Sequence, residues 1–141
     1  MAIVAVGIDR AVNPRRTTGF CGLTGPRSTR PRPLGSDREI LEATREAAPD
    51  VVSIDAPLSL PRGLRRLGAR TAPPFRACDL ALRARRIPFF PITLGPMRLL
   101  MARGIRLGRR LEADGFVVIE SYPGGAQEFS EGPARRTASS D

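Results

Sequence analysis

The sequence predicts an α/β protein whose sheet contains both antiparallel and parallel strands. Three apolar runs, at residues 3–8, 51–54 and 116–119, are rich in β-branched residues and have the length of strands. Helical patterns separate the second run from the third, as parallel strands require, whereas another strand-like segment follows the first run directly. A chain of 141 residues suits one domain with one hydrophobic core.

The first two strands are expected to form a hairpin. The run from Ile3 to Ile8 has the continuous apolar character of a strand that is buried on both faces. Residues 13–16 indicate a turn, and residues 17–23 are the expected antiparallel partner. Residues 25–35 are rich in Pro, Gly and Arg, which indicates a loop or a short, irregular edge strand.

A helix is expected to begin at Ser36, because Ser36 and Glu39 have the spacing of a capping box. Pro49 ends this helix, and residues 51–54 form the second buried strand. Residues 57–74 are expected to be a long loop, which in a small domain is usually functional or mobile.

Two more helices and a third strand complete the predicted domain. Residues 76–86 fit a short helix. A longer helix begins at Gly95 with Pro96 in its first turn, and Gly115 ends it. Residues 116–119 then form the third buried strand.

The end of the chain is expected to lie outside the domain. Residues 124–141 contain one large apolar residue, Phe129, among many small and polar ones. This composition is typical of a disordered or aberrant tail, so the predicted domain spans residues 1–123.

The composition excludes several kinds of catalytic site. All 23 basic residues are Arg, and His is absent. Without His there is no Ser-His or Cys-His pair, and without Lys there is no Walker A lysine or Schiff base. Carboxylates that work with a hard metal ion are the natural remaining choice. Aromatic residues are few, which argues against a stacking platform for single-stranded bases.

The charge favours a polyanionic partner. The net charge is +9 and the isoelectric point is about 11.4, which points to nucleic acid. A GC-rich coding bias is an alternative explanation for the excess of Arg. Cys21 and Cys78 form no metal-binding or disulfide motif and are expected to be buried and reduced. With no signal peptide and no membrane-spanning run, we expect a cytoplasmic protein.

One acidic pattern occurs three times. Asp9, Asp55 and Glu120 each stand at the C-terminal end of an apolar run. If the strands are neighbours, about 4.8 Å apart, these carboxylates converge at the sheet edge where α/β proteins bind ligands. Mg²⁺ or Mn²⁺ would relieve their repulsion and suits displacement at phosphorus. The alternative is that each acid is a solvated strand end.

Other polar residues are weaker candidates for the same site. Asp79 is either a fourth metal ligand or a charge that complements a helix N-terminus. The arginines that follow Asp55 either contact phosphates or belong to a solvated basic loop. The candidates for nucleic-acid binding are Arg62, Arg65, Arg66, Arg70 and Arg76.

Four sequence blocks resemble the domain-of-unknown-function family 429, in the family's order and over residues 3–125. They are Gly7–Pro14 with Thr18-Gly19, Ile54–Pro61, Arg76–Asp79 and Ile119–Gly124. The family is regarded as predicted nucleases of the ribonuclease H-like fold. The resemblance implies a mixed sheet with three antiparallel strands followed by parallel ones and flanking helices. It also implies divalent metal at strand-end acids, which correspond by position to Asp9, Asp55 and Glu120.

The chain departs from the family pattern in two places. Family members usually carry a C-terminal helix with a further Asp, and nothing after Pro123 resembles it. The chain is therefore expected to be C-terminally truncated, without one packing layer and one metal ligand. Arg10 stands where the family usually has an apolar residue, and a cation there would partly neutralise Asp9.

The sequence thus predicts a metal-dependent nuclease with Asp9, Asp55 and Glu120 as catalytic and metal-binding residues. Two alternatives stay open. A truncated, non-catalytic nucleic-acid-binding remnant would fit the missing helix. An actin-like ATP-binding fragment would also use an early Asp, but it needs a second similar domain that this length does not supply.

Overall fold

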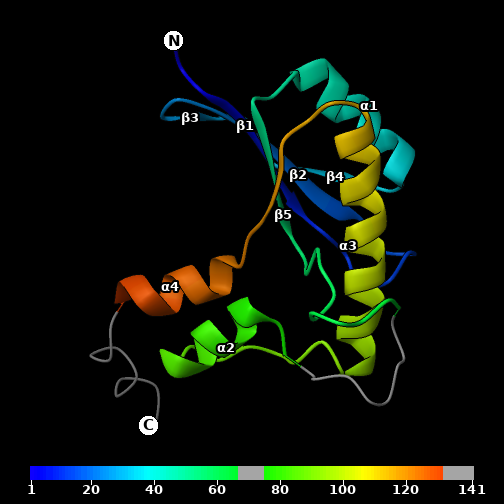
Figure 1. Cartoon of the computed structure of the whole chain (residues 1–141). Coiled ribbons are helices and arrows are strands. Elements are labelled where there is room, and N and C mark those ends of the chain that lie inside the picture. Colours follow the sequence, from blue (N-terminus) through cyan, green and yellow to red (C-terminus); the bar gives the residue numbers. More distant parts are fainter. Residues whose placement is uncertain (67–74, 132–141) are drawn as a thin grey trace, which may run out of the picture.

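A six-stranded mixed sheet with helices is the centre of the fold (Figure 1). The computed structural model describes residues 1–66 and 75–131, with the backbone alone for 128–131. The strands are β1 (Val4–Asp9), β2 (Thr18–Thr24), β3 (Arg27–Ser28), β4 (Arg32–Leu34), β5 (Val51–Asp55) and β6 (Val118–Glu120). The helices are α1 (Asp37–Ala47), α2 (Ala77–Ala84), α3 (Gly95–Ala113) and α4 (Pro123–Glu131).

The strand order confirms the predicted α/β class and the mixed sheet. The order is β3-β2-β1-β5-β6, and β4 also pairs with β2. β2 is antiparallel to β1, β3 and β4, whereas β5 is parallel to both β1 and β6. The carboxyl ends of β1, β5 and β6 therefore lie at one edge of the sheet.

The capping box predicted for α1 is present. The Ser36 hydroxyl accepts a hydrogen bond from the Glu39 backbone N–H at 3.2 Å, and the Glu39 carboxylate accepts one from the Ser36 backbone N–H at 2.8 Å. Both bonds satisfy amides that the first helical turn leaves without partners. Ala48 ends the helix in the left-handed region with φ of 44°.

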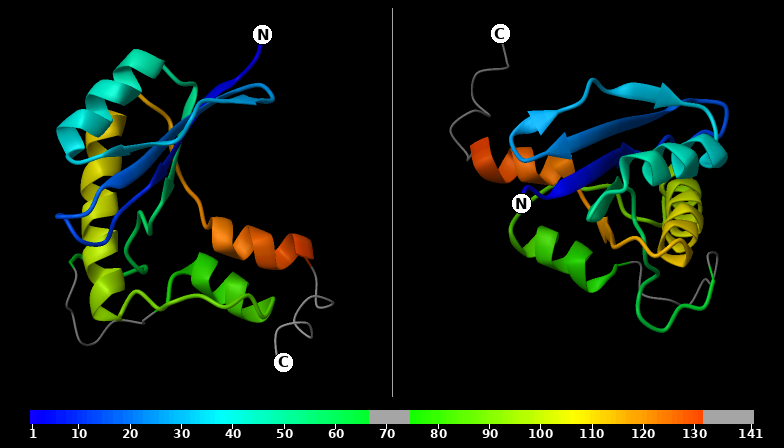
Figure 2. Two further views of the ribbon diagram at one scale, coloured as in Figure 1. Left: turned by 180° about the vertical axis from the view of Figure 1, so that it is seen from behind. Right: turned by 90° about the horizontal axis from the view of Figure 1, so that it is seen from above.

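Helices α1 and α3 cover one face of the sheet (Figures 1 and 2). This face presents alternate strand residues, as the period of two requires. The fully buried side chains at this interface are Val6, Val52 and Ile54 from the sheet, Ile40 from α1, and Leu107 and Leu111 from α3. Helices α2 and α4 do not cover this face; they lie beyond the sheet, near the carboxyl ends of the parallel strands.

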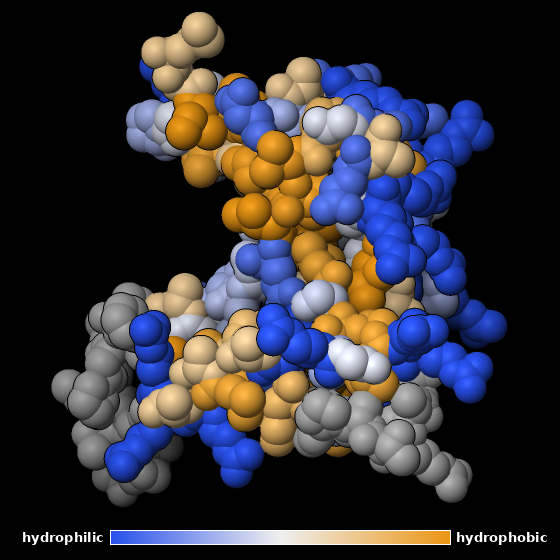
Figure 3. All heavy atoms as spheres, in the orientation of Figure 1, coloured by the Kyte–Doolittle hydropathy of each residue, from blue (hydrophilic) through white to orange (hydrophobic). Residues whose placement is uncertain are grey.

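The opposite face of the sheet is open, so the expectation of strands buried on both faces is wrong. Ile3, Val117 and Ile119 are 67%, 60% and 48% exposed. Within the described residues no helix packs over them, and Figure 3 shows this apolar surface in a hollow of the molecule. Cys21, which belongs to the same face, is half-buried rather than buried, and Cys78 on α2 is exposed.

The chain after Pro123 also differs from expectation. Residues Pro123–Glu131 form α4 instead of disordered chain. Tyr122 fixes the start of this helix, because its hydroxyl donates a 2.6 Å hydrogen bond to the Pro88 carbonyl oxygen. Residues 132–141, the rest of the expected tail, lie outside the described residues, as does the end of the predicted 57–74 loop. Among the described residues, no helix is long and apolar enough to cross a membrane.

Gly104 allows α3 to approach the segment that follows β5. A Cβ atom at this position would lie 2.8 Å from the Ala56 Cβ and 3.0 Å from the Pro57 carbonyl oxygen. Neither atom belongs to a flexible side chain, so the helix would have to move away. At Gly108, one turn later, a Cβ would meet nothing closer than 3.8 Å.

These two glycines give a matched pair of substitutions. Gly104→Ala is expected to destabilise the protein by about 1–2 kcal/mol, because overpacking outweighs the better helix propensity of Ala. Gly108→Ala is expected to stabilise it by up to about 1 kcal/mol. Urea unfolding of both variants measures the difference, and equal stabilities would contradict the close packing at Gly104.

Candidate functional site

Two of the three predicted carboxylates come together at the carboxyl edge of the sheet. Asp9 ends β1 and Asp55 ends β5, and the two residues are partners in the parallel register. Register partners point to the same face, so both side chains project on the open side of the sheet. Strand pairing alone therefore brings these carboxylates together, as the sequence predicts.

The pair lines a cavity of about 440 Å³ on the open face. Gly7 of β1 and Gly19 of β2 line the same cavity and contribute only backbone. A Cβ atom on Gly19 would lie 3.4 Å from the Asp9 Cβ, so any larger side chain would occupy space beside that carboxylate. Ser53 and Ser121 add two hydroxyl groups to the walls.

The electrostatics of this pair are unfavourable without a cation. Burial raises the pKa of Asp55 above its ordinary value, and the negative charge of Asp9 raises it further. Within the described residues neither carboxylate accepts a hydrogen bond or pairs with an arginine. Two adjacent oxygen donors with no compensating charge are suited to a hard divalent cation.

The third carboxylate, Glu120, lies on the other face of the sheet. In the parallel register Glu120 of β6 pairs with Ile54, not with Asp55. Ile54 is fully buried against the helices, so the Glu120 side chain leaves the sheet on the helix-covered side. Its carboxylate oxygen Oε2 accepts hydrogen bonds from the Leu58 backbone N–H at 2.9 Å and from Arg76 at 2.7 Å.

Arg76 connects Glu120 to the start of α2. Its guanidinium donates to both oxygens of Asp79, at 3.1 and 2.9 Å, and the Arg76 backbone N–H donates to Asp79 at 2.9 Å. The Arg76 and Asp79 side chains are 8% and 4% exposed. Burial alone would disfavour both charges, but the hydrogen bonds raise the pKa of Arg76 and lower the pKa of Asp79.

This network changes the roles predicted for Arg76 and Asp79. Arg76 is buried and bonded to two carboxylates, so it holds the fold together instead of presenting its charge to phosphates. Asp79 is bonded to Arg76 rather than grouped with Asp9 and Asp55. Partial burial of the sulfur raises the pKa of the Cys78 thiol although the residue as a whole is exposed, so the thiol stays protonated and is a poor nucleophile.

Arg10 does not neutralise Asp9 as expected. Consecutive strand residues point to opposite faces, and Arg10 is buried on the helix side. It forms an ion pair with Asp37 of α1 at 2.5 Å and also donates to the Thr18 hydroxyl. Arg10 therefore contacts Asp37 and Thr18 and forms no ion pair with Asp9.

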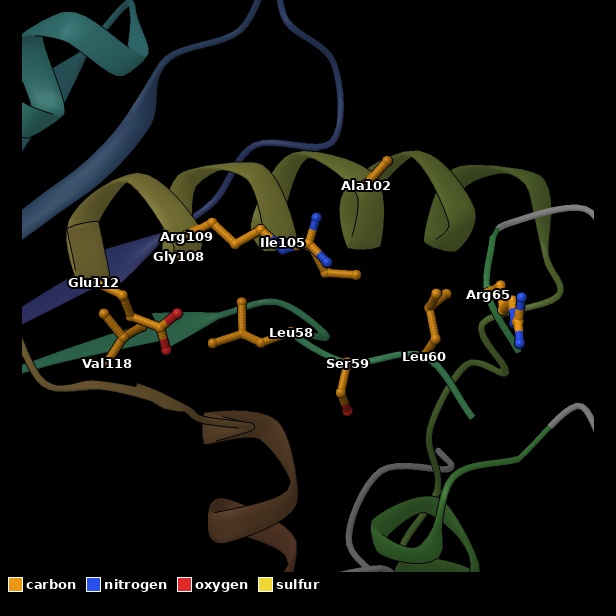
Figure 4. A pocket seen from close by; sticks show the side chains of 10 residues that line it. All are labelled: Leu58, Ser59, Leu60, Arg65, Ala102, Ile105, Gly108, Arg109, Glu112 and Val118. Atoms are coloured by element: carbon orange, nitrogen blue, oxygen red, sulfur yellow. The ribbon is translucent and has the colours of Figure 1, made fainter. Parts of the chain in front are cut away.

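The loop arginines lie apart from the carboxylate pair. Arg62, Arg65 and Arg66 are exposed. Arg65 lines a separate cavity of about 490 Å³ between α3 and the segment 58–65, together with Arg109 (Figure 4). Arg65 therefore faces a cavity other than the one that Asp9 and Asp55 line, and neither Arg62 nor Arg66 lines the cavity of that carboxylate pair. Arg70 lies outside the described residues.

No set of three or more Asp, Glu or Cys side chains in the described part of the chain is placed to hold a metal ion. The site therefore consists of two carboxylates, whereas the sequence predicts three. Comparison of the chain with protein-family models, with curated proteins and with solved structures finds no match. The resemblance to family 429 and the ribonuclease H-like fold stay predictions.

Charge crowding at Asp55 predicts an unusual stability effect. A carboxyl group with a raised pKa stabilises the fold in its protonated form, and this contribution is lost as the pH rises through the folded-state pKa. Asp55→Asn is therefore expected to raise the melting temperature of the metal-free protein at pH 7. The gain should shrink as the pH is lowered and wild-type Asp55 becomes neutral.

Thermal unfolding between pH 4 and pH 8 in EDTA tests this expectation. Glu46→Gln, which neutralises an exposed carboxylate on α1, is the matched control. A variant Asp55→Asn that is less stable than wild type throughout this range would show that Asp55 has a partner that stabilises its charge.

Arg76→Met is expected to destabilise the protein by about 3–5 kcal/mol, because it leaves the Asp79 carboxylate buried without a cation. The loss should be largest at neutral pH and smaller in acid, where Asp79 can take up a proton. The double variant Arg76→Met/Asp79→Leu should recover most of the stability, since it removes both buried charges. Urea unfolding measures each value, and Arg85→Met, at the exposed end of α2, is the control.

Proposed function

We propose that this protein is a divalent-metal-dependent phosphodiesterase acting on nucleic acid, with Asp9 and Asp55 as its metal ligands. The observation that carries the proposal is the register pairing of these two residues at the carboxyl edge of β1 and β5. No cation in the described part of the chain pairs with them, they line a cavity, and burial and the charge of Asp9 raise the pKa of Asp55. A site with these properties is stabilised when it binds a cation, because the cation relieves the repulsion between the two carboxylates.

The residues present fit Mg²⁺ or Mn²⁺. Both ions prefer oxygen donors and keep several waters, so two carboxylates are a sufficient set of protein ligands. When bound, such an ion supplies a Lewis acid that offsets phosphate charge and makes water more acidic. Asp9 and Asp55 would hold it, and the backbone at Gly7 and Gly19 leaves space for a phosphate group beside it.

Two further observations support the proposal. β1 is antiparallel to β2 and parallel to β5, and the arrangement agrees with the ribonuclease H-like fold that the sequence resemblance implies. The net charge of +9 attracts nucleic acid from solution. In this proposal Glu120 is not a metal ligand, because it holds Arg76 and the Leu58 backbone on the other face.

A non-catalytic nucleic-acid-binding protein of the same fold is the second candidate. It is favoured by the position of Glu120, which leaves the metal site with one acid fewer than the sequence predicts. The two candidates differ in what the acids do. A nuclease loses cleavage when Asp9 or Asp55 becomes an amide, whereas a binding protein has no cleavage to lose and keeps its affinity.

Titration with Mg²⁺ and Mn²⁺ during thermal unfolding tests the metal site first. An ion that binds only the folded protein stabilises it by about 1.4 kcal/mol at ten times its dissociation constant. Wild type and Glu46→Gln should show this stabilisation at millimolar metal, and Asp9→Asn and Asp55→Asn should lose it.

Cleavage of single-stranded and duplex DNA and RNA is then measured with the same variants. Metal-dependent cleavage that disappears in both Asp variants is the expected result. A wild type that cleaves none of the four substrates and gains no stability from either ion would contradict the proposal and leave the binding protein as the remaining candidate.

A further inference from the structure

A second cavity, of about 510 Å³, adjoins the carboxylate pair. It lies between α2, the segment 89–100 and the carboxyl ends of β5 and β6. Asp55 and Ser121 line this cavity and also the cavity that contains Asp9. The two spaces therefore meet at Asp55, and the volume of the second lies within the range of about 300–1,000 Å³ that is usual for small-molecule sites.

The walls of this cavity are largely apolar and include aromatic rings. Its apolar side chains are Leu82, Phe89, Phe90, Ile92, Met97 and Leu100. The Phe89 ring is held by an edge contact with Phe75, with 6.1 Å between ring centroids. Phe90 is 71% exposed, so its ring is accessible to a ligand in the cavity.

The low aromatic content predicts that the protein has no stacking platform for bases, but the position of the few aromatic rings also matters. Few aromatics are present, but the chain folds so that Phe89, Phe90 and Tyr122 line one cavity. Stacking needs one or two rings at the right place and not a high aromatic content.

One end of the cavity is polar and contains the Asp55 and Glu120 carboxylates, which can only accept hydrogen bonds when ionised, beside the Ser121 hydroxyl. Glu120 receives both of its hydrogen bonds on Oε2, so Oε1 accepts none from the described residues. Among residues 1–66 and 75–131, the Asp55 carboxylate also has no hydrogen-bond donor. Arg76, the cation at this end, is already bonded to Asp79 and Glu120. The cavity is therefore complementary to a flat apolar ring whose edge carries N–H donors.

We propose that this cavity binds one unpaired nucleobase that carries an exocyclic amino group, with guanine the best fit. The ring would stack against the aromatic wall, and its N–H groups would donate to Glu120 and Asp55. A phosphate of the same strand would then reach the space beside Asp9. The inference rests on the proposed function and narrows its substrate to single-stranded or unpaired nucleic acid.

Other occupants fit less well. An apolar peptide side chain would leave both carboxylate acceptors without a donor, at a cost in free energy. A bare phosphate or sugar phosphate would bring a negative charge against two carboxylates and would not use the apolar wall. A base can stack on the apolar wall and donate hydrogen bonds to the carboxylates at the polar end at the same time.

Calorimetric titration in EDTA tests base binding without any metal. The probes are guanosine 5′-monophosphate, inosine 5′-monophosphate and ribose 5-phosphate. Inosine lacks only the 2-amino group of guanosine, so it should bind about tenfold more weakly, as expected for one hydrogen bond to a charged acceptor. Ribose 5-phosphate should show no measurable binding.

A guanine-containing oligonucleotide, single-stranded or paired in a duplex, distinguishes a strand from a free nucleotide. The single strand should bind at least as tightly as the mononucleotide. In 0.5 M salt, where phosphate attraction is screened, the duplex should bind at least about tenfold more weakly than the single strand. Binding of the mononucleotide without binding of the strand would overturn the proposed substrate class.

Two matched pairs of variants locate the binding. Phe90→Ala should weaken binding of the single strand about tenfold, since it removes a stacking ring. Leu94→Ala, an exposed residue of the same segment that does not line the cavity, should leave affinity unchanged. On α2, Ala81→Leu narrows the cavity and should weaken binding, whereas Ala84→Leu should not.

The outcomes separate this inference from the proposed function. Equal affinities for guanosine monophosphate, inosine monophosphate and ribose 5-phosphate would overturn the base site, as would equal effects of Phe90→Ala and Leu94→Ala. Stabilisation by metal that is lost in Asp9→Asn would still stand in that case. Conversely, selective base binding in EDTA without any response to Mg²⁺ or Mn²⁺ would preserve the base site and overturn the metal-dependent activity.

Discussion

The register between β5 and β6 determines which carboxylates lie on the open face of the sheet and can hold one metal ion. Because Glu120 pairs with Ile54, its side chain leaves the sheet on the side of the helices, one residue out of step with Asp55. β1 has the other register, in which Asp9 is level with Asp55. A shift of one residue would exchange the faces and place three acids together on the open side. The pairing instead creates one crowded, uncompensated pair and one carboxylate that needs a cation of its own.

Arg76 is that cation, and it also lines the cavity of about 510 Å³ beside α2. It holds the start of α2 through Asp79 and the end of β6 through Glu120, so it fixes the helix against the sheet edge. Arg76, Asp79 and Glu120 all line the cavity between α2 and the segment 89–100, so this network forms part of its wall. A buried ion pair contributes little net stability compared with apolar packing, but it is costly to break. Here Arg76 acts on the position of Glu120. It donates a hydrogen bond to Oε2 and leaves Oε1 available as an acceptor.

Local sequence signals predict where helices and strands lie. The face of the sheet to which each side chain points depends on how distant strands pair. Ser36 with Glu39, and Pro96 at a helix start, act within a single turn, so the sequence indicates α1 and α3 directly. The end of a strand is also visible, which is why Asp9, Asp55 and Glu120 were found. Whether Glu120 aligns with Asp55 or with Ile54 depends on how two distant strands pair, and nothing local specifies it. The same limit applies to Ile119, whose apolar character suggested burial although it faces the open side.

A positive net charge attracts a polyanion at long range, but it does not specify where or how the polyanion would bind. Arg10 and Arg76 are buried in ion pairs, so part of the basic composition serves the fold, while exposed arginines such as Arg62 and Arg66 attract phosphates from a distance. At short range the attraction reverses, because Asp9 and Asp55 repel a phosphate unless a divalent cation lies between them. An uncharged base meets no such barrier in the adjoining cavity. In the proposed site, base binding would therefore set which nucleotide is held, and the metal would set whether its phosphate can come close enough to react.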